Sequence, residues 1–138
     1  MIELDNQTGF ALDVSLLNPL YEAVATQDVE LILMDDNGIR ELNREYRGKD
    51  APTDVLSFPV EPFPEAPLGT IVISVETAEK QGADHGHDTA TEIRILFLHG
   101  LLHLLGYDHE TDHGEMVRKE SQLRQQFGLP LSLTERNL

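Results

Sequence analysis

Residues 93–105 carry apolar side chains that would cover nearly every side of a helix. A helix that is apolar all round lies in the interior of a domain. Its unbroken apolar runs, such as residues 95–98, are far shorter than the ~20 residues needed to span a bilayer. Residues 89–92 read Thr-Ala-Thr-Glu, the form of a capping box, and so predict a helix start near Thr89. We therefore expect a buried helix at about residues 89–105, around which the chain folds.

The remaining chain alternates between strand and helix patterns. Runs rich in aliphatic and β-branched residues predict strands at 2–5, 29–34, 55–58 and 71–75. Apolar residues at helical spacing predict helices at 15–25, 39–46 and 112–127, and the proline-rich segment 61–67 predicts a loop. A chain of 138 residues has room for one such core. The pattern predicts a single α+β domain over residues 1–138, with a small mixed sheet packed against helices.

Cysteine is absent, which excludes disulfides and thiolate metal sites and leaves imidazole and carboxylate as metal ligands. The first residues lack the basic start and apolar run of a signal peptide. Together with the short apolar runs, this predicts a cytosolic protein without a membrane partner.

The net charge of −15 argues against a general affinity for nucleic acid, because phosphate binding favours basic surfaces. Four of the ten basic residues nevertheless fall within ten positions, namely Arg40, Arg44, Arg47 and Lys49. With acidic residues between them, charge alone favours a solvated helix face over a binding site.

Two histidines, His99 and His103, lie in the apolar helix at i, i+4 spacing. This spacing places them on one face, about 6 Å apart along the axis. His109 would point about 120° away from His103 if the helix continued. Gly106 can end the helix in a left-handed conformation, so that the chain turns back. The pattern His-x-x-x-His-x-x-Gly-x-x-His then converges on one point.

A single histidine on an apolar helix is usually a core residue bonded to a carbonyl group, and a pair can arise by chance. Three favour a metal ion, because unpaired imidazoles in such a helix would cost about 1–3 kcal/mol each. Three neutral nitrogens suit one zinc ion and leave a position open for water, as in catalytic sites. Asp108 fits two roles equally well, orienting an imidazole or capping a turn. The other histidines, His85, His87 and His113, are expected at the surface.

The histidine spacing equals that of the metzincin proteases, with one departure. Their general base is the glutamate after the first histidine, and here that position is Gly100. A glycine cannot accept a proton, which argues against ordinary peptide hydrolysis.

Two long motifs resemble a known family. Residues 99–109, His-Gly-Leu-Leu-His-Leu-Leu-Gly-Tyr-Asp-His, are similar to the signature of the YbeY endoribonucleases, bacterial zinc-dependent rRNA maturation factors. Residues 42–59, Leu-Asn-Arg-Glu-Tyr-Arg-Gly-Lys-Asp-Ala-Pro-Thr-Asp-Val-Leu-Ser-Phe-Pro, match the other long motif of that family. Length and element order agree too, so the resemblance covers nearly the whole chain.

The resemblance implies that His99, His103 and His109 bind zinc and that Arg47 lies near the active site. It also implies cleavage of single-stranded RNA, maturation of the 16S rRNA 3′ end, ribosome quality control and association with the small ribosomal subunit. A guanidinium at Arg47 would bind phosphate and stabilise its transition state. Without the motif, Arg47 would be a helix C-terminal charge worth ~0.3–1 kcal/mol. Thr70 stands where the family has an acidic residue.

We therefore expect a zinc-dependent endoribonuclease that acts on RNA and not on DNA, with one zinc ion per chain. Arg44 and Lys49 are tentative contacts to the RNA backbone. The general base is left open, since no carboxylate stands at the position of the metzincin base. Two other functions stay open: a metal-dependent peptidase or amidohydrolase, and a non-catalytic ribosome-assembly factor. In the second, a protein carboxylate such as Asp108 would complete the coordination of a structural metal.

Overall fold

The computed structural model describes residues 1–137, which form one mixed sheet surrounded by helices. The strands are β1 (Ile2–Asn6), β2 (Val29–Met34), β3 (Val55–Pro59) and β4 (Gly69–Ser74). They are arranged in the order β1-β2-β4-β3. β1, β2 and β4 run parallel, and β3 pairs antiparallel to β4. This arrangement confirms the predicted α+β class with a small mixed sheet.

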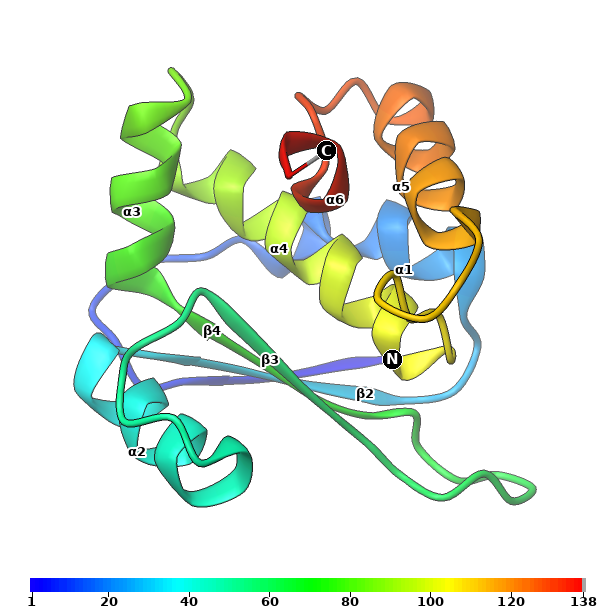
Figure 1. Ribbon diagram of the computed structural model, residues 1–138, viewed down its shortest axis with the longest axis horizontal. Helices are drawn as coiled ribbons and strands as arrows, with labels where there is room; N and C mark the ends of the chain where they lie inside the picture. Colours follow the sequence, from blue (N-terminus) through cyan, green and yellow to red (C-terminus); the bar gives the residue numbers. More distant parts are fainter. Residues whose placement is uncertain (138) are drawn as a thin grey trace.

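The helices lie on both faces of the sheet but unequally (Figure 1). α2 (Asp36–Arg47) covers one face, while α4 (Thr89–Leu104) crosses the other. Around α4 are grouped α1 (Asn18–Val24), α3 (Val75–Asp84), α5 (Glu115–Gln126) and α6 (Leu133–Arg136), and a 3₁₀ turn at Val14–Leu16 precedes α1. Within residues 1–137, none of these helices has the length and apolar character needed to cross a membrane.

The side chains of the central strand β2 point alternately to the two faces of the sheet and contribute to a core on each. Val29, Leu31 and Leu33 of β2 are fully buried in the large core under α4. Met34 packs on the opposite face, in a smaller cluster with Ile39 of α2. Successive side chains of a strand point to opposite faces, so the end of β2 that is covered on both faces, residues 31–34, is a continuous apolar run, while Glu30 is exposed.

α4 is the buried helix predicted from its composition, and it begins at Thr89 as expected. The predicted capping box is wrong, because the N-cap is Asp88, whose side chain accepts from the amide of Thr91. Glu92 turns inward instead and is fully buried. It binds His87 Nε2 at 2.6 Å and the guanidinium of Arg136 at 2.6 and 2.8 Å. The expectation of a surface position is therefore wrong for His87.

Other element boundaries differ from the predictions for local reasons. Val75 begins α3 instead of ending a strand, because the Ser74 side chain accepts from the amide of Thr77 and caps a helix there. α5 begins at Glu115, since the carboxylate of Asp112 accepts from the amides of Gly114 and Met116 in the preceding turn. α3 and α6 were not predicted from the sequence.

Gly100 lies where α4 approaches the sheet most closely. A Cβ atom at this position would lie 2.9 Å from Ile71 Cγ2 and 3.1 Å from Ser57 Oγ. The Ser57 hydroxyl also donates to the Gly100 carbonyl at 3.2 Å. The glycine at this position therefore serves helix–sheet packing.

Gly100→Ala is expected to destabilise the protein by about 1 kcal/mol. Alanine gains ~1 kcal/mol of helix propensity, but overpacking against the fixed Ile71 methyl group costs ~1–3 kcal/mol. Urea unfolding of both proteins measures the difference. A variant more stable than the wild type would show that the contact between helix and sheet is looser than the structure indicates.

Candidate metal centre

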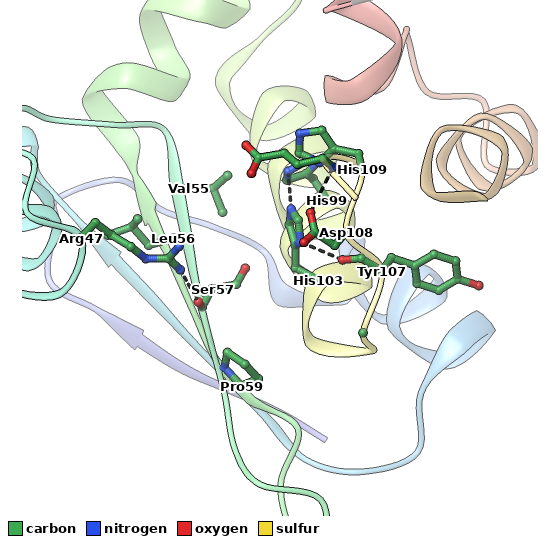
Figure 2. Close-up of a pocket in the computed structure, with 12 residues that line it drawn as sticks. Arg47, Val55, Leu56, Ser57, Pro59, His99, His103, Tyr107, Asp108 and His109 are labelled. Carbon is green, nitrogen blue, oxygen red and sulfur yellow. Dashed lines mark hydrogen bonds between the residues drawn. The ribbon is translucent and has the colours of Figure 1, made fainter. Parts of the chain in front are cut away.

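His99 and His103, one turn apart on α4, meet His109 from the loop that follows the helix (Figure 2). One ring nitrogen of each lies within 4.8 Å of the others. The return of the chain depends on Gly106, whose φ of 99° is left-handed. The amide of Gly106 donates to His103 O, and that of Tyr107 donates to Leu102 O, which closes the turn. The predicted convergence of the three histidines is therefore present.

The second nitrogen of each helical imidazole has a fixed partner. His103 Nδ1 lies 2.9 Å from the carbonyl oxygen of Tyr107, and a carbonyl can only accept, so this nitrogen carries the proton. His99 Nδ1 lies 2.6 Å from Glu120 Oε1. Burial raises the pKa of Glu120, but the hydrogen bonds from His99 and Thr134 outweigh it and leave that pKa below its usual value. Glu120 is therefore a carboxylate, and His99 Nδ1 donates to it.

Both Nε2 atoms are left as acceptors, and they face each other at 3.1 Å. Two lone pairs at this distance repel unless a cation lies between them. A proton is disfavoured there, because burial lowers the pKa of His103 and the neighbouring His99 lowers it further. Neutral imidazoles oriented by hydrogen bonds at Nδ1 are the form that binds divalent metals. The donor set thus fits a metal ion.

The three histidines line a cavity of about 410 Å³ whose opposite wall carries Arg47 (Figure 2). Arg47 ends α2, and one of its terminal nitrogens donates to the carbonyl of Ser57 at 3.0 Å. Its guanidinium carbon lies 6.0 Å from the centre of the Phe58 ring. These two contacts with β3 hold the side chain beside the cavity. Its other nitrogens have no partner among residues 1–137 and can donate to an anion.

Of the remaining predicted residues, only Asp108 lines this cavity. Asp108 lines the cavity, but its carboxylate accepts from the amide of Glu110 and caps a turn. Arg44 is exposed and pairs with Glu41 at 3.4 Å, and Lys49 is exposed. Neither Arg44 nor Lys49 lines the cavity. Thr70 donates to Glu30 on the neighbouring strand, also outside the cavity.

Sequence patterns missed Glu120, which lies 21 positions beyond His99 on a separate helix. Glu120 is one of two glutamates in the polar helix α5, and no sequence signal sets it apart from Glu115.

Comparison with known proteins gives the family. The sequence model of the family described as Endoribonuclease YbeY matches residues 6–128. A relative from Nautilia profundicola, named Endoribonuclease YbeY, is 55% identical over 137 residues, which cover 99% of both chains. The chain belongs to the YbeY endoribonuclease family.

Further relatives are similar to this chain over nearly its whole length. The one from Helicobacter pylori strain 26695 is 51% identical, over 99% of this chain and 98% of its own. Among solved structures, the solution structure of TM1509 from Thermotoga maritima superposes with a TM-score of 0.62 at 30% identity. It covers 92% of this chain and 89% of its own. The histidine cluster and Arg47 lie inside the region that the YbeY model matches.

Proposed function

We propose that this protein is an endoribonuclease that hydrolyses single-stranded RNA with one zinc ion held by His99, His103 and His109. The observation that carries the proposal is the pair of Nε2 atoms 3.1 Å apart, each imidazole fixed through Nδ1, in a cavity that also contains Arg47. Family membership supports the activity, since the relatives are named endoribonucleases. Zinc fits an all-imidazole ligand set better than magnesium or calcium, which prefer oxygen ligands.

The bound ion would act as a Lewis acid toward a phosphate oxygen and would acidify water. The protein supplies the rest of the site. The carbonyl of Tyr107 and the carboxylate of Glu120 keep the imidazoles in the ligating tautomer. Arg47, steadied by the Ser57 carbonyl, donates to the scissile phosphate and stabilises the charge that develops on it.

The biological substrate proposed here is ribosomal RNA. We assign the protein to maturation of the 16S rRNA 3′ end and to ribosome quality control, with the small ribosomal subunit as its partner in the cytoplasm. The net charge of −15 is consistent with RNA being held by a few focused contacts and by the ribosome, not by a broad basic surface. Residues 1–138 act as one catalytic domain.

Arg44 and Lys49 extend this binding site along α2 and the residues after it. Both are exposed and lie within three residues of Arg47 in the chain, so they can contact phosphates that flank the one bound by Arg47. Replacing both with glutamine is expected to weaken RNA binding and to reduce the slope of log affinity against log salt by about 1–2. Filter binding at several salt concentrations measures this. Unchanged affinity would remove both residues from the binding site.

Two observations count against the alternative functions. The glutamate that serves as base in the metzincin peptidases is replaced by Gly100, and the buried carboxylate beside the histidines, Glu120, is occupied by His99 and Thr134. Asp108, the carboxylate that would complete a structural metal site, is not part of the histidine cluster, and one of its oxygens accepts from the amide of Glu110.

Labelled RNA oligonucleotides test the proposed function. We expect zinc-dependent cleavage of a single strand, little cleavage of the same sequence in a duplex, and none of DNA or casein. End-group analysis of the products distinguishes two routes, since attack by the ribose hydroxyl leaves a cyclic phosphate and direct hydrolysis does not. Cleavage of casein, or zinc binding without RNA cleavage, would contradict the proposal in favour of a peptidase or an assembly factor.

A further inference from the structure

Glu120 of α5 connects the metal centre to the last helix of the chain. Its side chain is fully buried, and its two oxygens serve different partners. Oε1 accepts from His99 Nδ1 at 2.6 Å. Oε2 accepts from the hydroxyl of Thr134 at 2.9 Å and from its amide at 3.3 Å. A ligand of the proposed ion is thus joined through one carboxylate to α6.

Three further contacts fix the position of Thr134. Ser132 and Glu135 form a capping box that begins α6. Arg124 of α5 binds Glu135 through two hydrogen bonds of 3.0 and 3.1 Å, and Arg136 binds the buried Glu92 of α4. α6 is therefore held against α5 and α4, beside the helix that carries two of the histidines (Figure 1). Thr134 lies beyond the residues 6–128 that the family model matches.

We propose that Glu120 and Thr134 are positioning residues for the metal, so that metal binding and the docking of α6 stabilise each other. This inference rests on the proposed metal site at the three histidines. Thr134 holds the Glu120 carboxylate, and the carboxylate holds His99 with its proton on Nδ1 and its lone pair on Nε2. Coupling between two sites is reciprocal, so an ion that favours this His99 orientation also favours the docked α6.

The geometry requires a carboxylate at position 120, because each of its two oxygens faces a hydrogen-bond donor, His99 Nδ1 on one side and Thr134 on the other. A glutamine has one oxygen and one NH₂ group. If its NH₂ group faces His99, the imidazole must place its proton on Nε2, and that tautomer cannot bind the ion. If its NH₂ group faces Thr134, it opposes the Thr134 amide and loosens α6. Either orientation of Glu120→Gln weakens the coupling.

Zinc affinity measured by competition with a chromophoric chelator tests the proposal without relying on activity. We expect Glu120→Gln to bind zinc about 10–100-fold more weakly than the wild type, the usual effect of losing such a partner. Thr134→Val, which keeps the amide but loses the hydroxyl, should lose less, and Thr134→Ser should restore wild-type affinity. In the double variant Glu120→Gln/Thr134→Val the losses of zinc affinity should not add, because both residues act through the same carboxylate.

A stability control separates positioning from general loosening of the fold. Ile39→Ala removes a buried side chain on the opposite face of the sheet, so it should lower the melting temperature without changing zinc affinity. Hydrogen exchange gives a second readout, since added zinc should slow exchange of the Thr134 amide in the wild type but much less in Glu120→Gln.

The possible failures are distinguishable. Wild-type affinity in Glu120→Gln, with binding lost in His103→Ala, would overturn the positioning role and leave the metal site intact. Zinc affinity that falls equally in Ile39→Ala would also overturn it. A wild-type protein that binds no zinc would overturn the metal site and the positioning role together. If Glu120→Gln does not fold, the comparison of Thr134→Val with Thr134→Ser decides the question.

Discussion

His103→Ala is expected to lose the bound metal and to cut RNA at least about 10³-fold more slowly than the wild type. The substitution removes one of three nitrogens, and the Lewis acidity lost with the ion is worth several kcal/mol, where each 1.36 kcal/mol is tenfold in rate. Metal analysis of the purified proteins and initial cleavage rates on one single-stranded oligonucleotide measure both effects.

His113→Ala is the matched control for this variant. His113 is exposed and outside the histidine cluster, so the control should keep about one zinc per chain and full activity. Zinc should also raise the melting temperature of the wild type and of His113→Ala, but not of His103→Ala, because a ligand that binds only the folded state stabilises it. Stoichiometric zinc in His103→Ala would contradict the assignment of the site.

Arg47→Ala is expected to keep its metal and to lose about 10²–10³-fold in kcat/KM on RNA, the usual effect of removing one donor to a transition-state charge. The metal is retained because Arg47 lies across the cavity from the histidines and bonds to Ser57, not to an imidazole. Arg47→Lys should recover part of the loss, since lysine restores the charge without the paired donors of a guanidinium. Steady-state kinetics with metal analysis of each variant checks these outcomes.

Arg40→Ala provides the comparison for charge alone. Arg40 is an exposed arginine of the same helix that pairs with Asp50 at 2.7 Å, outside the cavity. Its removal changes the net charge by the same amount as Arg47→Ala and should have little effect on kcat. Equal losses in Arg40→Ala and Arg47→Ala would mean that Arg47 contributes only to the general field of the protein.

Sequence patterns over a few neighbouring residues correctly predicted the strand at 29–34 and the histidine cluster, because short-range interactions determine both. The strand at 29–34 was predicted with the bounds it has, because the side chains of β2 are buried along one face and those after the exposed Glu30 are apolar on both faces. The histidine cluster could be predicted too, since helical spacing and the left-handed turn at Gly106 bring its members together within eleven residues.

Contacts between distant segments could not be predicted in this way. The capping-box pattern at residues 89–92 was misleading because Arg136, 44 positions away, draws Glu92 into the core. The bonds from Glu120 to His99 and Thr134 likewise depend on how α5 and α6 pack against α4. Only the packing of the helices buries Glu120 and gives it these partners, so the sequence does not distinguish it from exposed glutamates.

A crystal structure of the zinc-loaded protein, with anomalous data collected at the zinc edge, tests the central claim most directly. We expect one strong anomalous peak bound by Nε2 of His99 and His103 and by His109, with no carboxylate of the protein among the ligands and Arg47 across the cavity. A peak elsewhere would contradict the metal site. A peak at the histidines whose coordination is completed by Asp108 would contradict the catalytic role and favour a structural metal.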